Sequence, residues 1–149
     1  MRAQVVIDVQ DGYIEKYEDG LLKSINQRIA DAKELQEHIV YIKNIKMLRS
    51  GKKTAELAKG LAVVSDVVFS KEQANAFACE ELLKFLGQNN INEVEIIGVD
   101  GNSCVAVSAM GAKKLGYKVS MRLECIGRRN IERFQHTIEE LRGKGIRMT

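Results

Sequence analysis

Short β-branched apolar runs alternate along the chain with longer segments whose apolar residues recur at helical spacing. The runs occupy residues 4–9, 38–43, 64–69, 93–98, 117–123 and 146–148. Most of them are apolar at consecutive positions, which is typical of strands covered on both faces of a parallel sheet. The pattern therefore predicts a mostly parallel sheet of five to six strands.

Four amphipathic stripes lie between these runs. With the three- and four-residue spacing of an α-helix, they pass through residues 21–32, 79–86, 105–115 and 131–141. Gly116 and Gly143 stand where helices are expected to end. Because strands and helices alternate, we expect right-handed crossovers and a three-layer α/β/α sandwich of Rossmann-like type, formed as a single domain by residues 1–149.

The least regular part of the chain is the polar, basic segment 44–59, where we expect a loop with one short helix. Arg49, Lys52 and Lys53 in this segment could line the mouth of a pocket and attract an acidic substrate. A solvated loop is the more common reason for such residues, so the role of residues 45–53 stays open.

A second basic group precedes the last predicted helix. Arg128, Arg129 and Arg133 begin this helix, where positive charge is mildly unfavourable. The arrangement leaves room for a partner carboxylate or a subunit contact, although a solvated face is the default interpretation.

Composition excludes several classes of protein. The 149 residues carry 23 Lys and Arg against 20 Asp and Glu, and a net charge of +3 is too small to indicate a nucleic-acid partner. No stretch approaches 18 continuous apolar residues, so we expect no membrane span. Cys79, Cys104 and Cys125 form no CxxC pair, and no signal peptide is evident, which fits free thiols in a reducing cytoplasm. Proline is absent, although average usage of about 5% predicts roughly seven.

The candidate chemistry lies where the strands end, because open parallel sheets bind ligands beyond the carboxyl ends of their strands. The first predicted strand ends at Asp8, the third ends near Lys71, and Cys104 begins the helix after the fourth. Asn102 is a suitable N-cap and would place Cys104 in the first helical turn, where free N–H groups and the helix dipole favour a thiolate. A nearby lysine would favour the thiolate further. Each residue alone is more often structural, but an acid, an ammonium and a thiol at one edge favour an active site.

Three segments resemble the isochorismatase-like cysteine hydrolases. Residues 5–13 (VVIDVQDGY) are similar to the family's opening signature, residues 70–77 (SKEQANAF) to its lysine segment, and residues 96–119 (IIGVDGNSCVAVSAMGAKKLGYKV) to its nucleophile segment. They occur in the family's order and extend over nearly the whole chain. The resemblance implies the isochorismatase-like hydrolase fold.

The resemblance also implies a catalytic triad of Asp8, Lys71 and Cys104. The thiol would attack an amide or related carbon, and the resulting acyl-enzyme would be hydrolysed. Asp8 would take and return the proton, and Lys71 would hold the other two groups electrostatically. The family carries a cis non-proline peptide before the nucleophile, here Val99–Asp100. The expected oxyanion hole consists of the N–H of Cys104 and one from this turn.

Five further residues are expected in the substrate pocket. Tyr13 and Phe77 would flank the nucleophile as an aromatic wall, although the periodicity fits Phe77 equally well to a helix core. Gly101 and Asn102 belong to the turn before the nucleophile, where glycine would let the backbone approach a substrate closely. Gln10 is placed in the pocket as well, with anchoring of the first loop as its alternative role.

The resemblance departs from the nicotinamidase-like members at their metal site. Those members bind a metal through an Asp and two His after the second strand, whereas His38 and His136 here are far apart and lack that spacing. We therefore expect no catalytic metal and no cofactor. The expected partners are a small-molecule substrate and further copies of the chain, in a cytoplasmic homodimer or larger assembly.

The leading interpretation is a cysteine hydrolase that cleaves a C–N bond of a small amide-like molecule. The alternative is a catalytically degenerate relative that binds a small ligand or a protein partner without turnover. A thiol redox sensor would need a second cysteine near Cys104, and none is evident. Residues 98–103 (GVDGNS) match neither the P-loop pattern nor GxGxxG, which disfavours a nucleotide-binding protein.

Overall fold

The computed structural model describes residues 1–48 and 50–149. Its strands are β1 (Arg2–Ile7), β2 (His38–Leu48), β3 (Gly51–Thr54), β4 (Val68–Lys71), β5 (Glu93–Gly98), β6 (Lys118–Ile126) and β7 (Arg147–Met148). Its α-helices are α1 (Leu21–Glu34), α2 (Glu80–Gln88), α3 (Cys104–Lys114) and α4 (Ile131–Gly143). Two short 3-10 helices, η1 (Ile14–Lys16) and η2 (Ala76–Ala78), complete the described elements.

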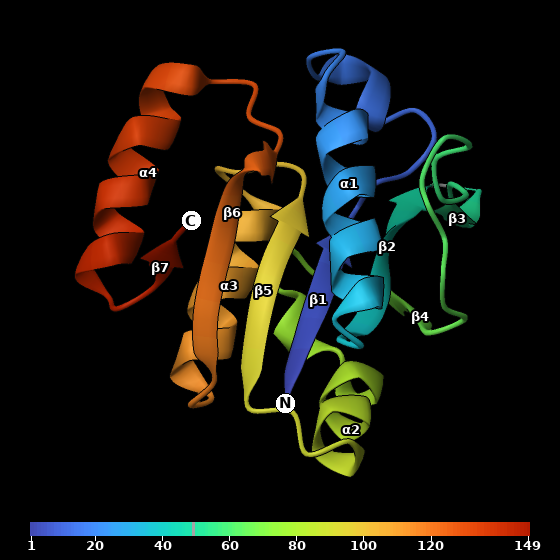
Figure 1. Cartoon of the computed structure of the whole chain (residues 1–149). Coiled ribbons are helices and arrows are strands. Elements are labelled where there is room, and N and C mark those ends of the chain that lie inside the picture. The colour runs from blue at the N-terminus through green and yellow to red at the C-terminus, as the bar shows by residue number, and fades with distance from the viewer. Residues whose placement is uncertain (49) are drawn as a thin grey trace.

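The strands form one sheet in the order β3-β2-β1-β5-β6-β7, with β4 also paired to β2 (Figure 1). All pairings are parallel except that of β2 with β3. The predicted three-layer sandwich with a mostly parallel sheet is therefore confirmed, and the sheet has one strand more than the upper number expected. The additional strand comes from the segment that was expected to be a loop.

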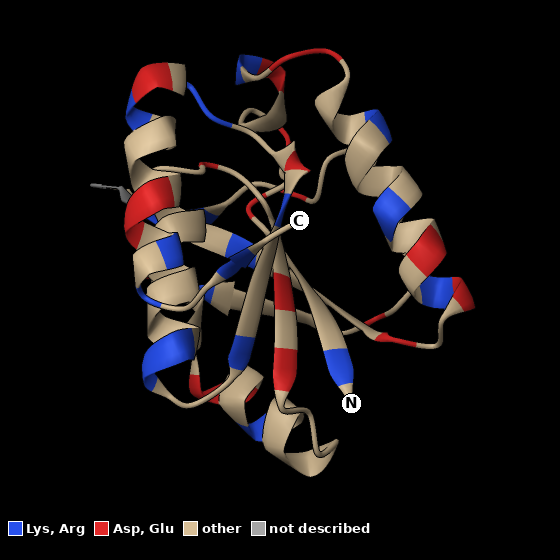
Figure 2. Cartoon of the chain, turned by 60° about the vertical axis from the view of Figure 1, so that its left-hand side comes forward, with Lys and Arg blue, Asp and Glu red and all other residues tan. Residues whose placement is uncertain are grey.

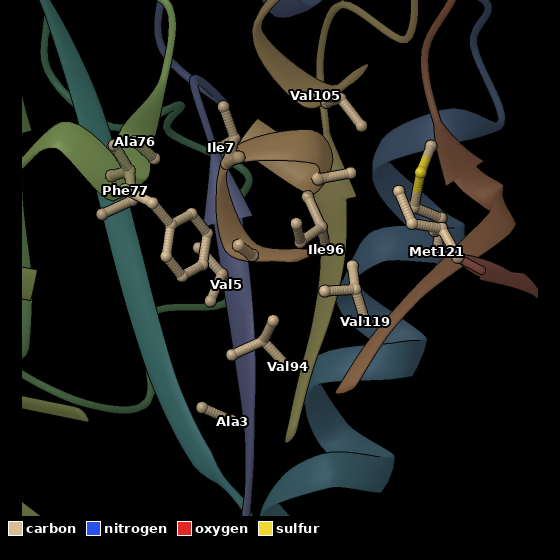
Figure 3. Packing of buried hydrophobic residues seen from close by; sticks show 14 of the residues in the cluster. Ala3, Val5, Ile7, Ala76, Phe77, Val94, Ile96, Val105, Val119 and Met121 are labelled. Carbon is tan, nitrogen blue, oxygen red and sulfur yellow. The ribbon is translucent and has the colours of Figure 1, made fainter. Parts of the chain in front are cut away.

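The two faces of the sheet are buried under different helices. Alternate side chains of a strand point to opposite faces, so Val5 and Ile7 pack with α2, α3 and α4, while Val6 packs with α1. Figure 3 shows the ring of Phe77 next to Val5, with other labelled core residues such as Val94, Ile96 and Val119 spread across the neighbouring strands. Because both faces are covered, the strands read as nearly continuous apolar runs. No helix in the described part of the chain is long and apolar enough to cross a membrane.

Residues 45–48 and 51–54 of the basic segment pair as a hairpin, so the prediction of a loop with a short helix was wrong for them. Strand β2 continues to Leu48 and pairs antiparallel with β3, with Ile45 opposite Thr54 and Lys46 opposite Lys53. Gly51 has φ of +113°, a backbone conformation that favours glycine at this turn. The alternating polar residues are accommodated because this end of the sheet is exposed.

Smaller differences concern boundaries. The strand expected at 64–69 begins only at Val68, because Val64 lies in an irregular segment where its N–H donates to the hydroxyl of Tyr41 (3.0 Å). Gly116, with φ of +94°, follows α3 as predicted. Gly143 still belongs to α4, and the left-handed residue after that helix is Gly145, with φ of +88°.

The irregular segment 55–67 is held to the sheet by hydrogen bonds. The hydroxyl of Tyr41, at the centre of β2, donates to the carbonyl of Ala62 (2.7 Å), and the hydroxyl of Ser65 donates to the carbonyl of Ile39 (2.6 Å). The N–H of Ala58 donates to the carbonyl of Val9 (3.0 Å). These bonds fix the path of the chain between β3 and β4.

One charged cluster is buried within the sandwich. Glu95 of β5 is fully buried and accepts hydrogen bonds from Arg28 of α1 (2.6 Å to Nε), Arg122 of β6 (3.3 Å to Nε) and Arg2 of β1. Glu37 also contacts Arg28 (3.2 Å). In Figure 2 the red bands on one strand lie between strands that each carry a blue band. The cluster joins three neighbouring strands to α1.

Candidate active site

Three chemically complementary side chains meet at the carboxyl ends of β1, β4 and β5. Asp8 follows β1, Lys71 ends β4, and Cys104 begins α3 after β5. The Nζ of Lys71 lies 3.2 Å from Oδ2 of Asp8 and 3.5 Å from Sγ of Cys104. Asn44 of β2 completes the surroundings of this ammonium, because its Oδ1 accepts a hydrogen bond from Lys71 (3.2 Å). The structure thus brings together the three residues selected by the sheet-edge rule.

The carboxylate of Asp8 is buried and only partly paired. Its side chain is 5% exposed, and that of Lys71 is 1% exposed. Oδ2 of Asp8 pairs with Lys71, whereas Oδ1 has no hydrogen-bond partner among the described residues. Asp8 also has φ of +56°, a left-handed conformation that few residues other than glycine adopt. Such a backbone at a buried, half-satisfied acid is typical of functional sites.

The pKa values of the acid and the thiol are both raised. Burial raises the pKa of Asp8, and the positive charge of Lys71 only partly opposes it. Burial is also the largest cause that raises the pKa of Cys104, followed by the negative charge of Asp8, while Lys71 lowers it. The expectation of a thiol acidified by the helix N-terminus and lysine was therefore wrong. Burial and the neighbouring carboxylate of Asp8 outweigh the lowering of the thiol pKa by Lys71.

The turn between β5 and α3 is built around Asp100. The peptide bond Val99–Asp100 is cis, as the family resemblance implies. The carboxylate of Asp100 accepts hydrogen bonds from the N–H groups of Asn102 (2.9 Å) and Arg129 (3.0 Å). One acid therefore ties the turn to the segment that leads into α4.

A cavity of about 320 Å³ lies at this edge of the sheet. Of the residues selected from the sequence, its wall contains Asp8, Tyr13, Val99, Asp100 and Cys104. It also contains six residues that the sequence analysis did not place in the pocket: Lys16, Tyr17, Asn44, Lys46, Ser103 and Arg129. A larger cavity of about 480 Å³ lies along α3, and none of the three reactive side chains lines it.

The turn before α3 and the first residue of that helix carry backbone donors that no described group uses. Ser103 occupies the N-cap position in place of the expected Asn102, and its side chain makes no capping hydrogen bond. The N–H of Val105 donates to the carbonyl of Asp100 (3.1 Å). Within the described part of the chain, we find no acceptor for the N–H of Asp100 or of Cys104. Both residues line the cavity, so an anionic oxygen bound there could receive both donors.

Two of the expected pocket residues lie elsewhere for structural reasons. Gln10 is fully buried, and its amide bonds the backbone of Asn44 (2.8 Å to N) and Ala55 (2.9 Å to O), so it anchors the first loop. Phe77 is 3% exposed and packs in the core with its ring 5.8 Å from that of Tyr117 (Figure 3). Neither side chain contributes to the cavity wall.

The two turn residues expected in the pocket contact α4 instead. A Cβ on Gly101 would lie 2.6 Å from the ring of Phe134, so this glycine allows close packing of the turn on the helix. The side chain of Asn102 donates to the carbonyl of Asn130 (3.0 Å) and accepts from the hydroxyl of Thr137 (2.7 Å). Both residues therefore hold the turn against α4 and the segment before it, and neither lines the cavity.

The basic hairpin contributes to the cavity through an unexpected residue. Lys46 lines the cavity with its ammonium 4.8 Å from the centre of the Tyr13 ring. Lys52 forms an ion pair with Glu72 instead, and Lys53 is exposed outside the cavity wall. Arg49, which the sequence analysis also considered, lies outside the described residues.

The donor set does not fit a metal ion. Among residues 1–48 and 50–149, no three His, Cys, Asp or Glu side chains are grouped so that they could hold one. His38 begins β2, at the end of the strand away from the cavity, and its ring lies 5.8 Å from that of Phe85. His136 is exposed on α4. The two imidazoles are therefore not neighbours of the thiol.

Comparison with known proteins identifies the family. The model of the isochorismatase domain matches residues 2–149. The chain belongs to the isochorismatase family. A curated relative, the maleamate amidohydrolase of Pseudomonas putida, is 27% identical over 79 residues, which cover 53% of this chain and 37% of the relative. The match therefore spans little more than a third of that relative's length.

Solved structures of isochorismatase-family proteins share the fold. A pyrazinamidase of Pyrococcus horikoshii in complex with zinc superimposes with a TM-score of 0.83 at 22% identity, and the match covers 99% of this chain and 98% of that one. A nicotinamidase of Staphylococcus aureus superimposes with a TM-score of 0.81 at 23% identity, covering 99% and 96%. At these identities the likeness establishes the architecture.

Proposed function

We propose that this isochorismatase-family protein is a hydrolase that cleaves the C–N bond of a small amide, with Cys104 as nucleophile. The observation that carries the proposal is the buried ammonium of Lys71, in contact with both the Asp8 carboxylate (3.2 Å) and the Cys104 thiol (3.5 Å). An acid and a thiol at a cavity wall, joined by a buried cation, are the groups that acyl transfer requires. The names of the relatives, an amidohydrolase and amidases, support the same reaction class.

In the proposed mechanism the thiol proton moves to Asp8 as the sulfur attacks the amide carbon and forms a C–S bond. The tetrahedral oxyanion is stabilised by the N–H groups of Cys104 and Asp100. The C–N bond then breaks while Asp8 gives its proton to the leaving nitrogen. Asp8 then takes a proton from water as the water oxygen attacks the thioester carbon. The C–S bond breaks, and Asp8 gives this proton to the sulfur, which restores the thiol.

The raised pKa values suit this exchange. A thiol with a raised pKa stays protonated until a base takes its proton, and a carboxylate with a raised pKa is a stronger base than an ordinary aspartate. The partnerless Oδ1 of Asp8 retains lone pairs for that proton. The ammonium of Lys71 contacts both groups and stabilises whichever of them is the anion.

One observation favours the alternative of binding without turnover. A thiol whose pKa is raised by burial is less nucleophilic at neutral pH than an activated one. This alternative predicts that small amides occupy the cavity without releasing ammonia, so the same assay distinguishes the two functions.

The test is a screen of small amides for ammonia release by wild-type protein, Cys104→Ala and Cys104→Ser. We expect both variants to lose at least about a thousandfold in kcat, the scale seen when a nucleophile is removed. Acid quenching of the wild type should trap an acyl adduct on Cys104, detected by mass spectrometry. A Cys104 variant as active as the wild type would refute the mechanism.

Cys79→Ser provides the matched control. This thiol is half-buried, lies outside the cavity wall, and contacts the carbonyl of Ser70 (3.8 Å). The control should keep wild-type activity and show the acyl adduct. A homo-oligomeric state stays a prediction of the family resemblance, and sedimentation analysis measures it. A cytoplasmic location stays a prediction from the unpaired cysteines.

A further inference from the structure

The cavity next to Cys104 carries an excess of positive charge that the proposed reaction does not use. Lys16 from η1, Lys46 from β2 and Arg129 from the segment before α4 all line it. All three residues are exposed to solvent at its rim. They come from three distant parts of the sequence, so only the fold brings them together.

These three side chains have no carboxylate partners in the structure. Within residues 1–48 and 50–149, none of them takes part in an ion pair. Two acids, Asp8 and Asp100, line the same cavity. Asp8 pairs with Lys71 instead, and both carboxylate oxygens of Asp100 accept backbone N–H groups. Three cations without an ion-pair partner thus outnumber the two acids in the wall of one small cavity.

From this arrangement we infer that the substrate is an amide that carries a carboxylate, bound by Lys16, Lys46 and Arg129 while its amide carbon lies at Cys104. The inference rests on the proposed function and names the substrate class of the same site. A guanidinium and two ammonium groups match a carboxylate, and Arg129 offers the forked donors that bind both of its oxygens. A cavity of about 320 Å³ suits a small molecule with both groups close together.

Aromatic rings limit where the anion can lie. The ammonium of Lys46 lies over the ring of Tyr13, a contact that holds it at the cavity wall. Tyr17 lines the same wall, and its pKa is raised by burial and by the negative charge of Asp100, so its hydroxyl stays neutral. A neutral donor hydroxyl beside three cations adds no repulsion to a bound carboxylate.

The test uses two alkylating reagents of nearly equal size, anionic iodoacetate and neutral iodoacetamide, each of which transfers its methylene carbon to Cys104 with loss of iodide. The ratio of their rates at Cys104 measures the preference for an anion and needs no turnover. We expect the combined Lys16→Gln, Lys46→Gln and Arg129→Gln variant to lower this ratio about tenfold, since each exposed cation contributes a few-fold. About 1 M NaCl should lower the wild-type ratio in the same direction.

The matched control removes three positive charges at the other end of the sheet. Lys33, Lys84 and Arg142 are exposed near the C-terminal ends or outer faces of α1, α2 and α4. Their combined replacement by Gln changes the net charge equally and should leave the ratio at Cys104 unchanged. The ratio at Cys79 serves as an internal reference in every variant.

A ratio that is equal in the wild type and the cavity variant, or that falls equally in the control, would overturn the inference. Either result leaves the proposed function intact, because that proposal is judged by ammonia release and the Cys104 variants. A substrate pair then gives the kinetic counterpart: the monoamide of a four-carbon diacid against its neutral diamide. The wild type should prefer the monoamide in kcat/KM, mainly through KM, and the cavity variant should lose that preference.

Discussion

Replacing the buried glutamate of β5 should strongly destabilise the fold. Glu95→Gln keeps the volume of the side chain but removes the charge that three arginines share. Removing one partner of a buried ion pair costs about 3–5 kcal/mol, because the other charge stays buried. Arg2 and Arg122 keep 25% and 29% side-chain exposure, and Arg28 keeps Glu37, so we expect the lower end of that range.

The assay is thermal and urea unfolding at pH 7. For a chain of this length, about 3 kcal/mol corresponds to a fall in Tm of roughly 6–12 °C. Glu93→Gln is the matched control, since Glu93 is 29% exposed and lies 3.5 Å from Arg2. The loss of this exposed ion pair should lower the free energy of unfolding by less than about 1 kcal/mol.

The pH dependence gives a second measure of the same cluster. Burial alone would raise the pKa of Glu95, but hydrogen bonds from Arg28 and Arg122 and the charges of Arg28 and Arg2 lower it below the ordinary value of 4.5. A lowered folded-state pKa gives stability that is complete above the unfolded value and is lost as pH falls through the folded value. The difference in the free energy of unfolding between the wild type and Glu95→Gln should therefore be constant near neutral pH and shrink below about pH 4.5. An equal Tm for Glu95→Gln and Glu93→Gln at pH 7 would refute this reasoning.

Three further predictions concern the site. Asp8→Asn should abolish hydrolysis, yet it should speed the alkylation of Cys104 by iodoacetamide at pH 7, because it removes a negative charge that raises the thiol pKa. A pH profile of alkylation that moves to higher pH would contradict this. Lys71→Met should lower the free energy of unfolding by about 3 kcal/mol at pH 7, because it leaves the Asp8 carboxylate buried and unpaired. Adding Asp8→Asn should restore most of this loss, measured by urea unfolding. No restoration would show that Lys71 acts by packing. Gly101→Ala should lower the free energy of unfolding by about 1–3 kcal/mol, because the added Cβ meets the ring of the buried Phe134. Adding Phe134→Leu should reduce this loss, whereas strictly additive losses of the two substitutions would disprove the contact.

The sequence was sufficient to predict which side chains meet at the sheet edge. Asp8, Lys71 and Cys104 follow strands whose apolar runs are long enough to recognise, and parallel strands place their carboxyl ends together. Asn44 could have been found by the same rule, since it follows the run at 38–43 directly. These positions depend on local pattern and one topological rule.

Other features depend on contacts between distant segments. Glu95 lies in a recognisable strand, but its burial depends on Arg2, Arg28 and Arg122, which are 27 to 93 residues away. The raised pKa of Cys104 depends on burial, which a helix-start pattern does not reveal. Lys46 lines the cavity because β2 continues past Asn44 into an antiparallel hairpin, a pairing that its polar residues do not signal.

The irregular segment before β4 decides which way the buried ammonium points. Strand β4 has four residues and pairs Lys71 with Asn44. Side chains of a strand alternate between faces, so a slip of one residue against β2 would turn Lys71 to the opposite side of the sheet. The hydrogen bonds between Ser65 and the carbonyl of Ile39 and between the hydroxyl of Tyr41 and the carbonyl of Ala62 fix the length of chain that reaches β4. The spacing of residues 55–67, rather than their chemistry, thus sets the register that keeps acid and thiol in contact with the same cation.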